Sequence, residues 1–199
     1  MASVPKPPQV LVCASAIGYY GSRGDEVLTE SSAPGSGFLA DVCVAWEREA
    51  KAAETLGTRV VMMRTGVVLD RNGGALRRML PPFRLGVGGR IGTGRQWMSW
   101  IHLDDLVALY VFALEHALAG PVNGVAPEPV TNADFTRALA SALHRPAIFP
   151  VPSAVLQLTF GEMSEILLAS QRVLPREAEA AGFIFRYPRI AEALGALFR

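Results

Sequence analysis

The chain is poor in cysteine and histidine, and both shortages exclude kinds of site. Among its 199 residues there are only 2 cysteines and 3 histidines. Two cysteines cannot form a disulfide framework and are typical of a reducing compartment, so we expect Cys13 and Cys43 to be buried thiols. The histidines, His102, His116 and His144, are scattered and lack the spacing of metal ligands. We therefore expect no metal site.

An excess of one charge and long apolar runs are also missing. The formal net charge is +1, which gives no argument for binding nucleic acid or an anionic membrane. The N-terminus MASVPKPP lacks the apolar core of a signal peptide, and the most apolar run, residues 106–114, is far too short to span a bilayer. Half of the residues are hydrophobic. The sequence therefore predicts a cytoplasmic globular domain with a sizeable core.

Strand-like and helix-like segments alternate along the chain. Short apolar runs bounded by proline and glycine predict buried strands, and apolar residues at helical spacing predict helices. The predicted strands are residues 10–13, 58–63, 121–125 and 183–187, with a loop at 64–74. The predicted helices are residues 38–54, 75–83, 104–118, 131–143, 155–171, 175–181 and 188–198. This alternation predicts an α/β fold with a parallel sheet.

The helix predicted at 38–54 divides into an apolar and a charged face. We expect its apolar positions to pack inward: Leu39, Val42, Cys43, Trp46, Ala50 and Ala53. We expect its charged positions to face water: Glu47, Arg48, Glu49, Lys51 and Glu54.

A glycine-dense stretch, LPPFRLGVGGRIGTGRQWMSWIHLDDL at residues 80–106, carries most of the candidate binding groups. Its five loop glycines allow positive φ angles and close approach to a bulky group, and Asp104 with Asp105 predicts a helix start. A loop of this kind beside helix amides is either an anion site or a purely structural loop. Neither a Walker pattern nor a dinucleotide fingerprint is present in the chain.

The segment GTGRQWMSWIHLDDL resembles the G-x-G-x-Q-x-R-D-x-(I/V)-H-V-x-D-(L/V) segment of extended short-chain dehydrogenases/reductases, the family of nucleotide-sugar epimerases and dehydratases. The matching positions are Gly92, Gly94, Gln96, Ile101, His102, Asp105 and Leu106. Met98 and Ser99 replace the usual Arg-Asp pair, as in an atypical NADP-dependent epimerase/oxidoreductase branch. The resemblance implies a Rossmann-type, doubly wound parallel sheet, a small C-terminal substrate-side α/β region, and NADP or NAD as cofactor.

The resemblance also implies that the first half of the Rossmann domain is absent. VLVCASAIGYYG aligns with the fourth strand of the family, and the pyrophosphate-binding turn lies upstream of that strand. We therefore expect residues 1–80 to be the C-terminal half of the NAD(P)-binding domain. Residues 81–144 would be the glycine-rich loop with helices joining back to the sheet, and 145–199 the C-terminal epimerase-family region. Such a chain would bind cofactor weakly or not at all, and its open strand edge would favour a homodimer or aggregation.

The family's catalytic residues are not preserved. The alignment places Ala16 at the catalytic serine position, Leu39 at the tyrosine and Cys43 at the lysine, so the standard proton transfer is not supported. Ser15 and Tyr20 are the candidate substitutes, although Tyr20 could equally pack and close a loop. The implied cofactor-binding residues are Ser15, Ala16, Thr65, Gly66 and Val67. The candidate substrate-binding residues are Arg90, Arg95, Gln96 and Trp97, with solvated arginines and tryptophan packing as the alternative.

Two functions fit this pattern. The first is an NAD(P)-dependent epimerase/oxidoreductase that acts on a nucleotide-sugar-like small molecule, with neither nucleic acid nor membrane as partner. The second is a non-catalytic NADP-binding regulatory protein, similar to relatives described as cell-division inhibitors. Loss of the serine, tyrosine and lysine together favours weak or unusual chemistry.

Overall fold

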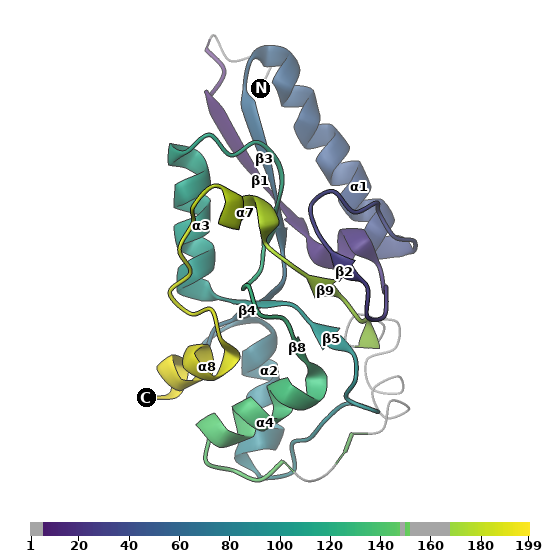
Figure 1. The fold of residues 1–199 in the computed structure, drawn as a ribbon, viewed down its shortest axis with the longest axis vertical. Coiled ribbons are helices and arrows are strands. Elements are labelled where there is room, and N and C mark those ends of the chain that lie inside the picture. Colours follow the sequence, from purple (N-terminus) through teal and green to yellow (C-terminus); the bar gives the residue numbers. More distant parts are fainter. Residues whose placement is uncertain (1–5, 148–149, 152–167) are drawn as a thin grey trace.

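The described part of the chain is built on a small parallel sheet. The computed structural model describes residues 6–147, 150–151 and 168–199. Strands β1 (Val10–Ala16), β3 (Arg59–Thr65) and β7 (Gly120–Gly124) run parallel in the order β1-β3-β7 (Figure 1). Apolar, β-branched sequences suit strands that are covered on both faces. The predicted α/β fold with a parallel sheet is confirmed.

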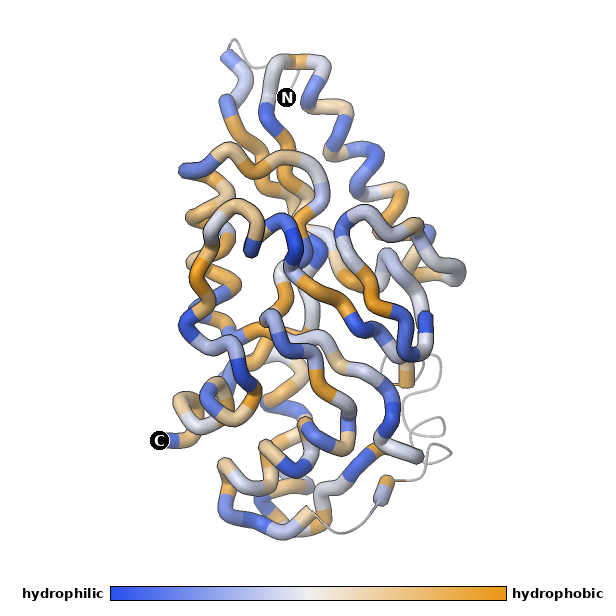
Figure 2. The backbone as a smooth tube through the Cα atoms, viewed as in Figure 1, coloured by the Kyte–Doolittle hydropathy of each residue, from blue (hydrophilic) through white to orange (hydrophobic). Residues whose placement is uncertain are grey.

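Helices lie on both faces of this sheet. Figure 1 places α1 (Phe38–Lys51) and α3 (Leu103–Glu115) on opposite sides of the strands. Successive side chains of β3 point to opposite faces of the sheet. Val60 therefore packs in a core cluster with Ala50 of α1, and Val61 packs in a core cluster with Leu109 of α3. The interior strands are the most apolar part of the backbone trace in Figure 2. In the described residues β1 has a strand partner on one side only, β3.

The expected orientation of α1 was partly wrong, because Cys43, Ala50 and Ala53 are buried as expected but Leu39 and Trp46 are not. Its buried positions are Ala40, Cys43, Glu47 and Ala50, whereas Leu39 and Trp46 remain 40% and 55% exposed. The small residues let the helix lie close to the sheet, and the Glu47 carboxylate binds Arg64 of β3. This ion pair turns the helix so that its larger apolar side chains face outward.

A second group of helices continues below the sheet in Figure 1. The helices α2 (Gly74–Arg84), α4 (Asn132–Ala142) and α8 (Ile190–Phe198) pack around a common apolar core that includes Trp100 and Phe135. The strand pairs are β4 (Val67–Leu69) with β6 (Trp100–His102), β5 (Trp97–Met98) with β8 (Val130–Thr131), and β2 (Val27–Leu28) with β9 (Arg172–Val173). The remaining short helices are η1 (Ile17–Tyr20), η2 (Ala52–Leu56) and α7 (Arg176–Ala180).

Two predicted segments differ from the structure. Strand β4 lies inside the predicted loop 64–74, because Val67 to Leu69 find a parallel partner in β6. Residues 183–187, predicted as a strand, form none. The Asp105 carboxylate instead accepts the backbone N–H groups of Arg186 and Tyr187, each at 2.9 Å, and holds this segment across the start of α3. Most of the helix predicted at 155–171 lies outside the described residues. None of the helices in the described ranges is both long and apolar enough to cross a membrane.

The assignment of α3 to the sheet can be tested by two leucine truncations in that helix. Leu109 is fully buried and Leu114 is 50% exposed. Leu109→Ala should lower the free energy of unfolding by about 2–5 kcal/mol, since it leaves a cavity in the core. Leu114→Ala, the matched control, should change it by less than about 0.5 kcal/mol. Urea denaturation of both variants measures the difference, and equal losses would contradict the placement of this helix.

Candidate functional site

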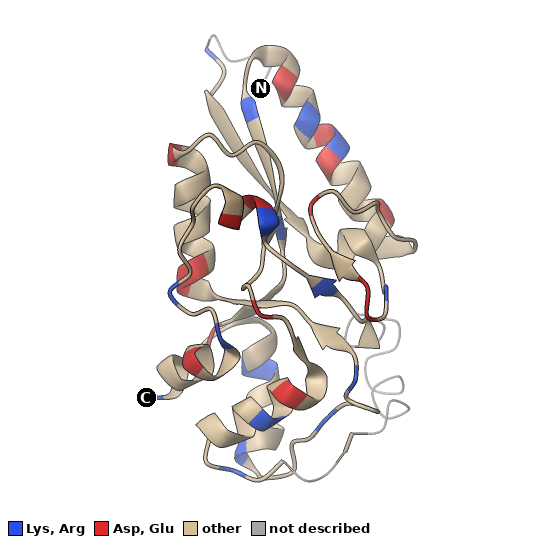
Figure 3. Ribbon diagram, in the orientation of Figure 1, with Lys and Arg blue, Asp and Glu red and all other residues tan. Residues whose placement is uncertain are grey.

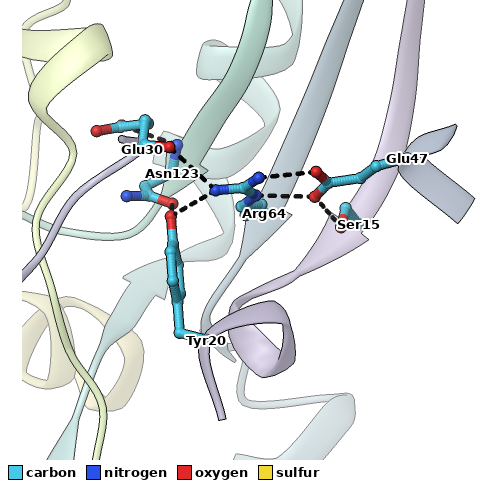
Figure 4. Close-up of polar contacts among 6 residues, drawn as sticks. All are labelled: Ser15, Tyr20, Glu30, Glu47, Arg64 and Asn123. Atoms are coloured by element: carbon cyan, nitrogen blue, oxygen red, sulfur yellow. Dashed lines mark hydrogen bonds and ion pairs between the residues drawn. The ribbon is translucent and has the colours of Figure 1, made fainter. Parts of the chain in front are cut away.

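A row of polar side chains crosses the sheet near the C-terminal ends of its strands. Ser15 of β1, Arg64 of β3 and Asn123 of β7 are register partners and therefore lie on one face. The Arg64 guanidinium donates to both carboxylate oxygens of Glu47, from Nε at 2.8 Å and from Nη2 at 2.7 Å (Figure 4). Ser15 Oγ donates to the same carboxylate at 2.8 Å. The Arg64 side chain is 4% exposed, so this is a buried, two-pronged ion pair.

Tyr20 closes the other side of the Arg64 guanidinium. Its hydroxyl donates to Asn123 Oδ1 at 2.7 Å and accepts from Arg64 Nη1 at 3.0 Å. The Tyr19 ring lies under the guanidinium at 3.5 Å, in a cation–π contact. Burial raises the pKa of Tyr20 to about 12, even though Arg64 acts in the opposite direction. Tyr20 is therefore a neutral, fully engaged hydroxyl at neutral pH.

Glu30 completes this network with a buried carboxylate. Glu30 Oε1 accepts the backbone N–H of Asn123 at 3.0 Å and that of Glu177 at 3.3 Å. Its Oε2 atom is buried and has no hydrogen-bond partner within the described residues. Burial raises the pKa of Glu30, because the charged form is disfavoured away from water. The Glu30 carboxylate thus links β7 to α7 by accepting backbone N–H groups, and it forms no ion pair within the described residues.

The hydroxyl groups of both predicted catalytic residues form hydrogen bonds within the protein. Ser15 is 7% exposed and Tyr20 is fully buried, and each is bonded to a neighbour in the network. The geometry favours a structural role for both, while their participation in catalysis stays a prediction. Cys43, at the position of the family's lysine, is 3% exposed. Burial also raises its pKa, so its thiol is kept protonated.

The predicted cofactor-binding residues form a half-buried strip at the same edge of the sheet. Ala16 and Thr65 are register partners at the ends of β1 and β3, and Gly66 and Val67 follow directly. Thr65 Oγ1 donates weakly to Met63 O at 3.4 Å and also interacts with the Tyr110 side chain. A side chain on Gly66 would meet Ser99 O at 2.6 Å, so the backbone is closely packed there. The strip is half-buried and carries the Thr65 hydroxyl, and none of its residues supplies a cation for the phosphates of a cofactor.

The four candidate substrate residues lie in and after the glycine-rich loop, and three of them make contacts within the chain. Arg90 Nη1 donates to Thr93 O at 3.0 Å, and Gln96 Nε2 donates to Ile91 O at 3.2 Å. Trp97 Nε1 donates to Asp25 Oδ1 at 2.8 Å, and Arg172 stacks on its ring at 4.4 Å. Arg95 is exposed. The roles of these residues in binding a substrate remain predictions.

The bulky group that the loop glycines approach is part of the chain. A side chain on Gly88 would meet Phe83 at 2.6 Å, and one on Gly94 would meet Ala133 at 3.0 Å. Gly86, Gly92 and Gly94 have positive φ angles. The loop is therefore closed against α2 and α4.

His102 caps helix α3. It precedes α3, and its Nδ1 accepts the Asp104 backbone N–H at 3.1 Å, which makes it the helix cap. Its ring lies 4.1 Å from that of Tyr187. Burial lowers the pKa of His102, with the nearby Asp104 and Asp105 carboxylates opposing that effect.

Sequence reasoning did not find the network as a cluster. Glu30 and Arg64 were not among the predicted site residues, and Glu47 was expected to face water. The available signal was an arginine at the end of an apolar strand, because a cation there requires a buried counter-charge.

The chain matches a family model over most of its length. A model described as the NAD dependent epimerase/dehydratase family matches residues 2–126. The chain belongs to this family. A domain of unknown function (DUF1731) matches residues 151–197. The resemblance to extended short-chain dehydrogenases/reductases is thereby confirmed.

Individual relatives agree with this assignment. The chain is 50% identical over 187 residues to epimerase family protein Mb2239 of Mycobacterium bovis, and the match covers 93% of the chain and 62% of that relative. The structure of human epimerase family protein SDR39U1 with NADPH has a TM-score of 0.89 and 38% identity, over 98% of this chain and 67% of that one. A nucleoside-diphosphate sugar epimerase from Corynebacterium glutamicum has a TM-score of 0.77 and 40% identity, over 96% of this chain and 38% of that one. The chain thus spans about three fifths of the length of the mycobacterial relative.

The buried ion pair predicts a strongly non-additive response to substitution. Glu47→Leu should lower the free energy of unfolding by about 3–5 kcal/mol, because it leaves the Arg64 charge buried without a partner. The double variant with Arg64→Met should lose less than the two single variants together. Glu49→Leu, which changes an exposed carboxylate on the same helix, is the control and should unfold like the parent. Urea denaturation gives the four values, and simple additivity would contradict the pairing.

The lowered pKa of His102 predicts that the free energy of unfolding decreases in acid. The folded pKa lies below the unfolded value of about 6.5, so the unfolded state takes up more protons between these two values. Stability should be fully present above about pH 6.5 and should fall as the pH drops toward the folded pKa. His102→Asn keeps a capping side chain without this titration, so its stability should depend less on pH in that range. His116→Asn alters an exposed histidine and is the control. Identical pH profiles for the parent and His102→Asn would exclude this role.

Proposed function

We propose that this chain forms the nicotinamide-side and substrate-side part of an NADP(H)-dependent epimerase/oxidoreductase. The observation that carries the proposal is the half-buried strip at Ala16 and residues 65–67, where β1 and β3 end side by side. In open α/β sheets, ligands bind beyond the carboxyl ends of the strands. Membership of the epimerase family and the NADPH bound to human SDR39U1 support this cofactor.

The residues of the strip would hold the nicotinamide end of the cofactor. Bound NADPH would supply a hydride, and the chain would supply a surface for the ring. Ala16 places few side-chain atoms there, so a ring would lie close to the backbone, and the Thr65 hydroxyl would be a hydrogen-bond partner for its carboxamide. Within the described residues, no basic side chain belongs to the strip, so the phosphates would be held by another part of the protein.

The substrate we propose is a small nucleotide-sugar-like molecule. The similarity to a nucleoside-diphosphate sugar epimerase supports this class. The exposed Arg95 and the neighbouring Arg90 are the groups we propose to meet a substrate phosphate. Proton transfer would need a group other than Leu39 and Cys43, since neither can act as the family's tyrosine and lysine do. We expect turnover of common nucleotide sugars to be low for that reason.

Cofactor binding tests the proposal directly. We expect the 199-residue chain to bind NADPH poorly and an N-terminally extended form with a glycine-rich phosphate loop to bind it well. In the extended form, Thr65→Val should weaken NADPH binding by about threefold to tenfold, as expected for one lost hydrogen bond. Thr55→Val, which changes an exposed threonine, should leave it unchanged. Isothermal titration calorimetry measures NADPH binding by the 199-residue chain, the extended form and its two variants. Tight binding by the 199-residue chain, or no effect of Thr65→Val, would contradict the model.

A further inference from the structure

One continuous stretch of the chain is strongly basic although the protein is nearly neutral. The formal net charge is +1, yet residues 71–103 contain neither aspartate nor glutamate. The same stretch contains six arginines: Arg71, Arg77, Arg78, Arg84, Arg90 and Arg95. Figure 3 shows Lys and Arg positions without acidic ones on α2, in contrast to the mixed signs on α1. Positive charge is therefore concentrated in and around one helix.

Three of these arginines line a single cavity on the outer face of α2. The cavity has a volume of about 520 Å³, within the range of small-molecule sites. It is lined by Arg71, Asn72, Arg77, Leu80, Pro81 and Arg84. Arg77, Pro81 and Arg84 recur at helical spacing on the exposed face, while Leu76 and Phe83 bury the opposite face in the core. Because the buried face anchors the helix in the core, the backbone positions of the arginines on the exposed face are fixed.

The charges in this cavity have no ion-pair partner among the residues that the structure describes. Arg71, Arg77 and Arg84 form no ion pair within the described residues, unlike Arg64, whose charge is matched by Glu47. Arg77 Nη1 has one weak contact, with Asn72 O at 3.4 Å. The nearby Asp70 is occupied in its own loop, where Oδ1 accepts the Asn72 backbone N–H at 3.0 Å. Three like charges around one cavity repel each other, and a bound polyanion would remove that cost.

We propose that this cavity binds a small molecule with at least two linked phosphate groups. Guanidinium groups match phosphate oxygens in pairs, and three of them around one space provide more positive charge than a single phosphate needs. Pro81 lies between the arginines and is exposed, so it offers an apolar contact for the rest of the ligand. The site shares no residue with the cofactor strip and lies beyond β4 from it, so it does not depend on the proposed function.

The test uses inorganic pyrophosphate as the probe and calorimetric titration at low salt. Arg77→Gln and Arg84→Gln should each weaken pyrophosphate binding about tenfold, the effect of losing one charge-assisted contact. Arg78→Gln changes an exposed arginine on the same helix that does not line the cavity, and it should bind like the parent. Thermal melts verify that all three variants are folded. Binding should weaken with rising salt, as expected for exposed charges.

Several outcomes would overturn this proposal. They are no measurable binding of pyrophosphate, an equal loss in Arg78→Gln, or orthophosphate binding as tightly as pyrophosphate. Tighter binding of a DNA duplex than of pyrophosphate would instead indicate a nucleic-acid surface and would also reject the proposal. NADPH binding by the extended form should be unchanged in Arg77→Gln, which separates this site from the cofactor strip.

Discussion

The fold around the candidate site depends on the buried ion pair between Arg64 and Glu47. A charge that is 4% exposed is tolerated only when a partner and hydrogen bonds satisfy it. Arg64 obtains that partner from α1, and Ser15 and Tyr20 complete the coordination. The pair therefore fixes the rotation of α1, the position of η1 and the alignment of three strands in one arrangement.

The same arrangement limits the chemistry available at this edge of the sheet. Hydroxyl groups that could transfer protons are engaged in the network, and burial raises the pKa of Tyr20 to about 12. The ligand-facing surface is left with small residues and the Thr65 hydroxyl. The network therefore favours a structural role for these hydroxyls, and any catalytic role of Ser15 and Tyr20 stays a prediction.

The Arg64 side chain is buried and paired in the sheet, whereas the arginine side chains around α2 are exposed and, within the described residues, unpaired. Around the sheet, buried arginine and glutamate are paired and locked into the core. On and just before α2, exposed arginines line a cavity and have no ion-pair partner among the described residues. A charge in an ion pair has a defined position but attracts a ligand only weakly, because its partner already neutralises it. An unpaired charge still attracts a ligand of opposite sign. The second region is therefore where an anionic ligand gains most.

The sequence by itself determined the α/β class, most element positions and the family, because these depend on periodicity and on local motifs such as the segment from Gly92 to Leu106. The buried Cys43 also followed from local context, whereas the cap of α3 is His102 and not the predicted Asp104 or Asp105. Only the tertiary structure decided which face of α1 packs inward, since a buried Arg64 outweighed the apolar pattern that favoured Trp46. It also decided that residues 183–187 attach to Asp105 and form no strand. Contacts between residues far apart in the chain set both outcomes, and no local pattern encodes such contacts.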